Sequence, residues 1–302
     1  MKSQSRIKKK ESKKRGNNLV DLSIYEVSPR DGLQNSSFDM TKEEKVFLIE
    51  SLHDAGLKNM EIASFVNPKY VPKMADSEEV FTATKYLDDF GVLIPNQRGF
   101  DRATKVGAKK INVFFSVSEE FNKRNLNMNL QDKFEELDEM LIDVDRKDVR
   151  AYISCAFGCP FEGKPKEHAL KDAMLKADYL AETVVLCDTI GVAHPTQMVQ
   201  TLELSRGLDA DIALHLHENS NLQRNIFDNV KVAAEWGVNM FDSSVNALGG
   251  CPFIPNSGSN LSTNQFIAWA NNNNYETGVE LENLEDVTQF LRNKNKILLE
   301  AF

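Results

Sequence analysis

The sequence predicts an α/β fold, a (β/α)8 TIM barrel that forms a single domain with an extra C-terminal helix. From about Leu22 onward, short β-rich runs alternate with amphipathic stretches of helical spacing. Eight such pairs within about 260 residues are the size of one barrel. The first turn, Ser28-Pro29-Arg30-Asp31-Gly32, is not the glycine-rich phosphate loop that a doubly wound open sheet usually carries there. The barrel is therefore favoured over the open sheet.

Eight segments have the composition of strands, with β-branched and other apolar residues bounded by turn residues. In chain order we expect strands at Leu22–Ser28, Met60–Phe65, Val92–Pro95, Ile111–Val117, Ala151–Ala156, Thr183–Cys187, Ile212–His217 and Met240–Val245. In a barrel, the carboxyl ends of these strands and the loops that follow them form one mouth, where active sites of this class lie.

Amphipathic helices are expected between the strands. The clearest are Lys42–Asp54, Asp76–Leu87, Leu130–Ile142, His168–Ala181 and Asn225–Trp236. A glycine follows several helical stretches, which suits the left-handed residue that commonly ends a helix; these are Gly56, Gly91, Gly107 and Gly237. The stretch Leu281–Leu299 would add a helix packed on the barrel. No internal linker or repeat calls for a second domain, so the barrel domain would cover 21–302.

The chain begins with a basic segment. Among its first eighteen residues, eight lysines or arginines face one glutamate, a balance of about +7, which leaves about −16 for the rest of a chain whose total is −9. We expect 1–20 to be a disordered tail, because it cannot bury apolar area. The acidic body argues against nucleic acid as a partner. No apolar run reaches the roughly 18 residues of a membrane span, so no membrane partner is expected.

The four cysteines point to a reducing compartment. None lies in a C-x-x-C pair, and their spacing is not that of a disulfide framework. No secretory apolar region is found at the start, and the lysine-rich segment lacks the arginine-rich amphipathic pattern of transit peptides. We expect a cytoplasmic protein, with a mitochondrial location as the alternative.

Two histidines indicate a metal site. His215 and His217 are two residues apart on one predicted strand, so their side chains point to the same face. The last strand of a closed barrel lies between the seventh and the first, so Asp31, after the first strand, and Asn260, in the final loop, can converge on the histidines. Two nitrogens and two oxygens, with water or substrate in the remaining positions, suit Mg²⁺ or Mn²⁺. The alternative is that the histidines are only hydrogen-bonded in the mouth and that Asp31 is a turn residue paired with Arg30.

Two further residues have the character of site residues. Glu61 lies in an apolar strand, and a buried carboxylate needs a partner, for which Arg30 is the candidate. Cys251 lies in Ala247–Pro252, where paired glycines allow the loop to swing and a proline stiffens its far side. A cysteine at such a tip is placed to move onto a substrate.

An ordered set of motifs resembles 3-hydroxy-3-methylglutaryl-CoA lyase. These motifs are Tyr25–Asn35, Ala63–Lys69, Ser154–Gly163, Cys187–Val192, Asp242–Val245 leading into Gly249–Pro252, and Asn260–Thr263. The likeness runs from about residue 22 to near the C-terminus. The related isopropylmalate and homocitrate synthases share the arginine–aspartate pair and the H-x-H, whereas the glycine–cysteine loop is typical of the lyases.

The resemblance implies a metal-dependent lyase that cleaves 3-hydroxy-3-methylglutaryl-CoA, or a close acyl-CoA analogue, to acetyl-CoA and acetoacetate, and that forms a homodimer. Each site residue then takes a role: metal ligation by Asp31, His215, His217 and Asn260, catalysis by Arg30, Glu61, Asp188 and Cys251, and substrate binding by Gln34 and Ser64. In such a retro-Claisen cleavage, Mg²⁺ or Mn²⁺ acidifies the tertiary hydroxyl, Arg30 stabilises the enolate and Cys251 helps deliver the proton. The initial base is left open between Asp188 and a water or histidine near the metal.

The chain departs from the family's pattern at the mouth of the barrel. Glu218–Asn221 replaces an aspartate and a Thr-Tyr-Gly stretch, Ser36 and Ser37 replace Glu-Lys-type residues, Asn264 replaces a glutamate, and 253–259 is poorer in alanine and glycine. These departures predict a changed substrate or a tuned rate with the metal chemistry retained. Two alternatives are a Claisen-type synthase of the same superfamily, which the cysteine loop and the lack of a regulatory domain disfavour, and a non-catalytic homologue that binds metal without turnover.

Overall fold

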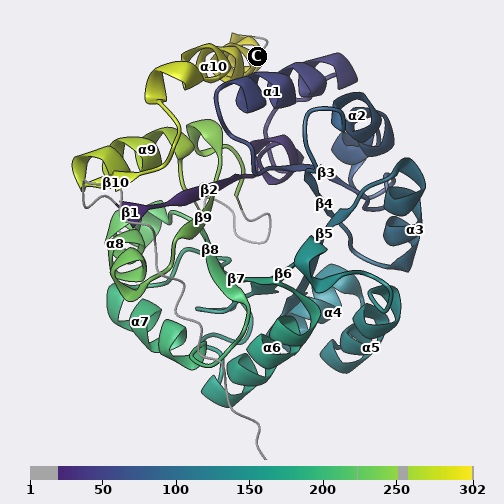
Figure 1. Cartoon of the computed structure of the whole chain (residues 1–302), viewed down its shortest axis with the longest axis vertical. Coiled ribbons are helices and arrows are strands. Elements are labelled where there is room, and N and C mark those ends of the chain that lie inside the picture. The colour runs from purple at the N-terminus through teal and green to yellow at the C-terminus, as the bar shows by residue number, and fades with distance from the viewer. Residues whose placement is uncertain (1–19, 223, 251–257, 301–302) are drawn as a thin grey trace, which may run out of the picture.

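The computed structural model describes residues 20–222, 224–250 and 258–300, in which eight parallel strands form a barrel within a ring of helices (Figure 1). The barrel strands are β2 (Ser23–Glu26), β3 (Glu61–Ser64), β4 (Gly91–Leu93), β5 (Lys110–Ser116), β6 (Val149–Ser154), β7 (Thr183–Asp188), β8 (Asp211–Leu216) and β9 (Met240–Ser243). Every neighbouring pair is parallel, and a backbone bridge from Glu26 to Met60 brings β2 to β3. The predicted (β/α)8 barrel is confirmed.

Several strands end earlier than predicted, because the chain leaves the sheet to build the mouth. After β2 it enters a single π-helical turn, Ser28–Gly32, with Pro29 as its second residue. β4 ends at Leu93 rather than at Pro95, whose missing N–H cannot extend a ladder. These early ends place the polar residues that follow the strands in turns and loops around one opening.

Ten α-helices lie in the described part of the chain. They are α1 (Lys42–Asp54), α2 (Ser77–Thr84), α3 (Gln97–Val106), α4 (Glu119–Leu126), α5 (Leu130–Met140), α6 (Glu167–Leu180), α7 (Pro195–Leu204), α8 (Ile226–Trp236), α9 (Thr263–Asn272) and α10 (Glu285–Glu300). The five helices named from the sequence are all present, with ends shifted by up to three residues. Polar caps set several starts: the Thr41 and Glu44 side chains form a capping box on α1, and Asn225 caps α8 instead of belonging to it.

Three of the four predicted glycine caps have the expected conformation. Gly56, Gly107 and Gly237 follow α1, α3 and α8 with φ of 102°, 90° and 120°, which an L-residue rarely adopts. The prediction for Gly91 is wrong. This glycine begins β4, and it is needed for space inside the barrel rather than for a left-handed turn.

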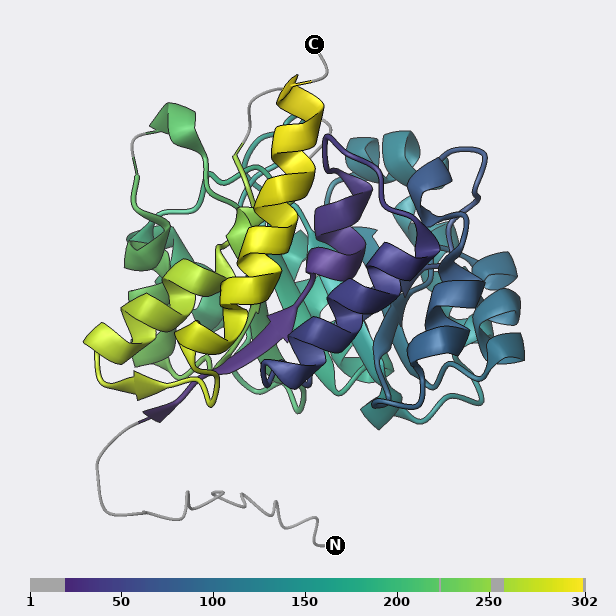
Figure 2. The same ribbon diagram turned by 90° about the horizontal axis from the view of Figure 1, so that it is seen from above.

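The ends of the described chain pack on the outside of the barrel. Val20, assigned to the tail from sequence, pairs with Tyr275 in a small sheet of β1 (Val20–Asp21) and β10 (Tyr275–Glu276), while the rest of the predicted tail lies outside the described residues. The extra C-terminal helix is present as α10, beside α1 (Figure 2), and Lys294 forms an ion pair with Glu44 of α1.

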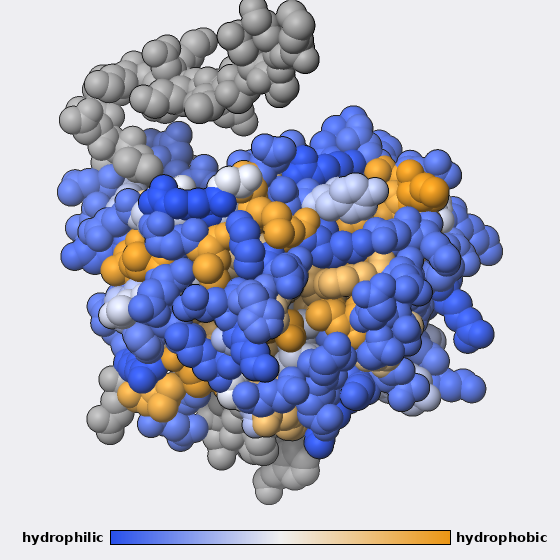
Figure 3. All heavy atoms as spheres, turned by 90° about the horizontal axis from the view of Figure 1, so that it is seen from below, coloured by the Kyte–Doolittle hydropathy of each residue, from blue (hydrophilic) through white to orange (hydrophobic). Residues whose placement is uncertain are grey.

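Apolar residues fill the layer between strands and helices, whereas polar residues gather inside the barrel. On the face shown in Figure 3, surface hydrophobic residues form separate patches among hydrophilic ones. No helix in the described ranges is long and apolar enough to cross a membrane. Buried polar residues on the barrel strands include Glu26, Glu61, Asn112, Arg150, Asp188, His215 and Asp242. Such groups are stable in a core only when they are paired, so this interior is the place to look for a site.

Candidate active site

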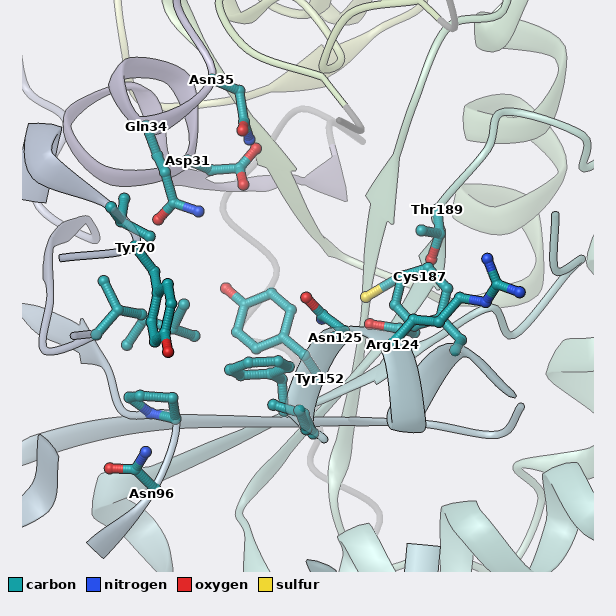
Figure 4. A pocket seen from close by; sticks show the side chains of 18 of the residues that line it. Asp31, Gln34, Asn35, Tyr70, Asn96, Arg124, Asn125, Tyr152, Cys187 and Thr189 are labelled. Carbon is teal, nitrogen blue, oxygen red and sulfur yellow. The ribbon is translucent and has the colours of Figure 1, made fainter. Parts of the chain in front are cut away.

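A cavity of about 800 Å³ opens at the mouth formed by the strand ends. Its wall includes Arg30, Asp31 and Gln34 after β2 and His215 and His217 at the end of β8. Asp31 and Gln34 lie on one side of it and Cys187 and Thr189 on the other (Figure 4). The cavity therefore gathers residues from strands that are far apart in the sequence, as the barrel topology requires.

Three predicted metal ligands meet at this wall. Asp31, His215 and His217 each offer one ligand atom, and these atoms lie within 4.8 Å of one another. The fourth, Asn260, donates from Nδ2 to Asp31 Oδ2 at 2.8 Å. Its Oδ1 and the Nε2 of His217 are buried and have no hydrogen-bond partner among the described residues. Orphaned buried acceptors beside a carboxylate and a second imidazole fit a divalent cation.

A hydrogen bond at Nδ1 of each histidine sets which ring nitrogen remains free to bind a metal. His215 Nδ1 lies 3.1 Å from Asp242 Oδ2, and the strand register aligns the two residues on β8 and β9. His217 Nδ1 lies 3.1 Å from the backbone oxygen of Asp188. Each bond is best made by an Nδ1–H donor, so the Nε2 atom of each ring is left as the metal-facing acceptor. Asp242 is itself held by a close ion pair with Arg150.

The charges of the site favour an anionic carboxylate beside a neutral imidazole. Burial alone would raise the pKa of Asp31, but Arg30 and the two histidines outweigh it and lower that pKa. Burial, and then the neighbouring His215, lower the pKa of His217 to about 4. For His215, burial lowers the pKa, yet the hydrogen bond and charge of Asp242 outweigh it and leave the pKa raised. Because a ligating histidine must be neutral, the raised pKa of His215 makes cation binding weaker as the pH falls.

Arg30 is held at the cavity wall by two carboxylates. Its Nη1 donates to Asp31 Oδ1 at 2.9 Å, and its Nε forms a close ion pair with Glu61 Oε2. The predicted pairing of Glu61 with Arg30 is therefore present. Glu61 is fully buried and does not line the cavity, so its contact with bound molecules would run through the guanidinium.

Asp188 and the predicted substrate-binding residues occupy different positions. Asp188 ends β7, and its carboxylate accepts the backbone N–H groups of Val192 and Ala193, both at 2.9 Å. Burial raises the pKa of Asp188 to about 6 although these bonds oppose the shift. Gln34 lines the cavity with an unpartnered Oε1, and Ser64 is fully buried with an unpartnered hydroxyl, both judged among the described residues. Cys251 lies outside the described residues.

One end of the cysteine loop packs against the metal-ligand cluster, and the other packs against Glu218, the residue after His217. A Cβ at Gly249, whose φ is 95°, would lie 2.7 Å from Asn260 Nδ2 and 3.0 Å from the backbone oxygen of Asp31. A Cβ at Gly258 would lie 1.1 Å from the backbone oxygen of Glu218. Only glycine allows these close approaches, so the loop leaves and re-enters the fold against residues of the site.

Some departures from the family pattern hold loops rather than contacting the cavity. Ser36 Oγ donates to the backbone oxygens of Leu33 and Phe38 at 2.9 and 2.7 Å. Asn264 accepts the backbone N–H of Asn246 at 3.0 Å and donates to Thr288 of α10 at 2.8 Å. Ser36, Asn264 and Glu218 are absent from the described cavity wall. They can therefore influence a bound molecule only through the loops that they fix.

Several residues that contact the site, all buried except the partly buried Tyr25, were given no role from the sequence. They are Tyr25, Asn112, Arg150, Tyr152 and Asp242, whose side chains lie inside the barrel. A signal existed for Arg150 and Asp242, because a charged residue within an apolar strand needs a partner, the same argument that singled out Glu61. The neutral residues carry no such signal.

Comparisons with known proteins agree with the motifs. Residues 21–291 match the HMGL-like family. The hydroxymethylglutaryl-CoA lyase of Pseudomonas mevalonii is 36% identical over 88% of this chain and 90% of its own length, and the mitochondrial enzyme of Macaca fascicularis is 35% identical over 89% and 84%.

Among solved structures, an HMG-CoA lyase from Acinetobacter baumannii in complex with coenzyme A and 3-methylmalate superposes with a TM-score of 0.84. It is 30% identical and covers 91% of each chain. The resemblance that the motifs predict is confirmed by these three comparisons. The chain belongs to the HMGL-like family, whose matched relatives are hydroxymethylglutaryl-CoA lyases.

Proposed function

We propose that this chain is a metal-dependent carbon–carbon lyase that cleaves 3-hydroxy-3-methylglutaryl-CoA, or a close acyl-CoA analogue, to acetyl-CoA and acetoacetate. The observation that carries the proposal is the convergence of Asp31, His215 and His217 next to Arg30 at the wall of one large cavity. The names of the relatives favour a lyase over a condensing synthase. Coenzyme A bound to a structural neighbour supports an acyl-CoA as the molecule that enters the cavity.

The cation would be held by Asp31, His215, His217 and the Oδ1 of Asn260. Oxygen and imidazole ligands without a thiolate suit Mg²⁺ or Mn²⁺. When bound, such an ion supplies Lewis acidity that lowers the pKa of a coordinated hydroxyl. Asp242 and the backbone of Asp188 keep the two histidine rings oriented toward it.

Arg30 would stabilise the negative charge of the product enolate. Its guanidinium is a fixed positive charge at the cavity wall, and Glu61 and Asp31 restrict its movement. A preorganised charge at the place where negative charge develops lowers the barrier without reorganisation during the reaction. Glu61 would act by positioning Arg30, because Glu61 is buried and does not line the cavity.

Proton transfers are assigned to two residues. A carboxyl with a pKa of about 6 can take up and release a proton near neutral pH, which is the ground for Asp188 as the initial base. Asp188 is absent from the described cavity wall and its two oxygens accept backbone N–H groups, so it would take the proton through a bridging water. A histidine or water beside the ligand cluster is the alternative base. Cys251 would deliver the proton that quenches the enolate, since its loop begins at Gly249 and Gly250 on the cavity rim. Gln34 would bind the acyl group through its unpartnered oxygen at the cavity wall. Ser64 is fully buried and absent from the described cavity wall, so it would act on the acyl group only through the residues around it.

Release of acetyl-CoA and acetoacetate from 3-hydroxy-3-methylglutaryl-CoA tests the proposal. We expect cleavage by the wild type with Mg²⁺ or Mn²⁺, loss of cleavage in His217→Ala, and a decrease of about 100-fold or more in Cys251→Ala, the size of one general acid–base contribution. A folded, metal-loaded wild type that cleaves neither this thioester nor shorter and longer analogues would contradict the proposal and favour a non-catalytic homologue. We further propose a homodimer, which sedimentation equilibrium of the same protein would test.

A further inference from the structure

A buried amide and a phenol lie directly behind the Arg30–Glu61 pair. Asn112, on β5, donates from Nδ2 to Glu61 Oε1 at 2.7 Å and to the Tyr25 hydroxyl at 2.9 Å. The other oxygen of Glu61 accepts from Arg30 Nε. The carboxylate of Glu61 is therefore held at both oxygens, by the guanidinium on one side and by the amide on the other. Glu61 and Asn112 are 0% and 2% exposed.

Gly91 provides the space for this arrangement. A Cβ at position 91 would lie 2.0 Å from the Tyr25 hydroxyl oxygen and 2.9 Å from Asn112 Nδ2. The register places Gly91 beside Glu61 on the neighbouring strand. Its φ lies outside the left-handed region, so its backbone would accept any residue. The glycine is required here because a methyl group would displace the phenol, a rigid ring that cannot bend away cheaply.

The ring of Tyr25 joins this group to the histidine side of the site. The Arg150 guanidinium lies 4.2 Å from the centre of the ring, within the range of a cation–π contact. Arg150 pairs with Asp242, which accepts from His215. Burial, more than the nearby charge of Glu61, raises the pKa of Tyr25, so the phenol stays neutral between the two ion pairs.

We propose that Tyr25 and Asn112, with the space left at Gly91, are positioning residues that fix Glu61 and, through it, the Arg30 guanidinium. A carboxylate held at one oxygen can rotate about its last side-chain bond, whereas one held at both oxygens fixes the plane of its partner. Arg30 also contacts Asp31, a predicted metal ligand, so the position of Arg30 must be set independently of Asp31 if the two are to act together. The catalytic consequence rests on the proposed lyase activity, but the geometry does not.

Steady-state kinetics of Asn112→Leu and Tyr25→Phe, in the full chain with Mg²⁺, provide the first test. Asn112→Leu keeps the side chain's bulk and removes the amide, and Tyr25→Phe keeps the ring over Arg150 and removes the hydroxyl. We expect kcat to fall about 10- to 100-fold in Asn112→Leu, the cost of a small misplacement of a reacting group. KM should change little, because the interaction is made in the transition state. Tyr25→Phe should act in the same direction and more weakly.

Two controls separate positioning from general destabilisation. Thr84→Val removes a fully buried hydroxyl that is bonded within α2, at a residue absent from the described cavity wall, so it should lower stability and leave kcat unchanged. In a Glu61→Gln background, adding Asn112→Leu should have little further effect on kcat, because the positioned carboxylate is already gone. Independent, additive losses in this double-mutant cycle would overturn the proposal.

The Nε–H signal of Arg30 in ¹H–¹⁵N spectra gives a readout that needs no turnover. The signal is assigned as the one missing in Arg30→Lys. We expect a slowly exchanging signal in the wild type that shifts or broadens in Asn112→Leu and is unchanged in Thr84→Val. If the wild type cleaves no acyl-CoA, the proposed function fails while this spectrum still decides the positioning role. An unchanged Arg30 signal in Asn112→Leu would overturn it.

Discussion

Asp242 shows how one residue can govern a site that it does not enter. It is fully enclosed, binds Arg150 with one oxygen and faces His215 Nδ1 with the other. The bond to His215 fixes the ring's tautomer and orientation, and the bond to Arg150 compensates the buried charge. The quality of the metal site therefore depends on a chain of contacts that runs behind the ligands.

Replacement of Asp242 by Asn is expected to weaken metal binding about 10- to 100-fold, the usual effect of losing such an outer contact. The amide of Asn can donate an N–H to His215 Nδ1. This favours the tautomer that carries its proton on Nε2, the nitrogen that should face the metal. Titration calorimetry with Mn²⁺ measures the affinity, and circular dichroism checks that the variant is folded. Asp138→Asn, which removes an exposed partner of Lys176, is the matched control. Equal affinities in the wild type and Asp242→Asn would mean that His215 does not bind the ion.

At this scale the sequence reveals residues whose spacing or charge is unusual. His215 and His217 share a strand face, and Glu61 is charged within an apolar run, so local patterns predict them. Asn112 and Tyr25 are 87 residues apart and neutral, and their contact depends on which strands become neighbours. No local pattern contains that information.

At the scale of elements, Glu203 joins two neighbouring helices on the outside of the barrel. Its carboxylate, on α7, accepts from Trp236 Nε1 of α8 at 2.8 Å and from Arg206 Nη2 at 2.7 Å. The bonds from Arg206 and then Trp236 lower the pKa of Glu203 from 4.5 to about 2. A carboxyl with a depressed folded pKa stabilises the fold above its unfolded pKa and loses that effect as the pH falls through the folded value.

The stability difference between the wild type and Glu203→Gln should therefore depend on pH. It should be present near neutral pH and shrink as the pH falls from 4.5 toward about 2. The effect will be small because the group is exposed to solvent. Urea denaturation at a series of pH values measures it, with Glu235→Gln on the exposed side of α8 as the control. A difference that stays constant over this range would show that the three groups do not interact in solution.

Element types were predictable because each helix and strand carries its own periodicity, but element ends were not. The end of β4 follows from Pro95, a local signal that the predicted strand ignored, whereas the role of Gly91 depends on a tyrosine from another strand. Gly56, Gly107 and Gly237 are needed for the positive φ that follows a helix end, which is a local requirement. Gly91 is needed because the Tyr25 side chain of another strand occupies the space of a Cβ. A sequence rule for glycine cannot distinguish these two uses.

At the scale of the whole molecule, the candidate metal site exists only when the barrel is closed. Asp31 and Asn260 are 229 residues apart in the sequence, yet Asn260 Nδ2 lies 2.8 Å from Asp31 Oδ2. The two histidines come from a third segment of the chain. An unfolded chain cannot present these ligands together. The repeated β/α pattern predicted this convergence, because the carboxyl ends of barrel strands and the loops after them meet at one mouth. The packing of the cysteine loop ends against Asp31 and Glu218 depends on tertiary contacts that the pattern does not encode.

Because the ligands converge only in the folded state, metal binding should stabilise the whole protein. An ion at 100 times its dissociation constant adds about 2.7 kcal/mol to the free energy of unfolding. In a chain of this size, each kcal/mol raises Tm by about 2 to 4 °C or somewhat less, so the expected rise in Tm is several degrees. Differential scanning calorimetry with Mn²⁺, and again after addition of EDTA, measures the shift. His217→Ala should lose most of the rise, while Asp138→Asn should keep it. An equal rise in His217→Ala would show that the ion stabilises the fold from another place and that this cluster is not its site.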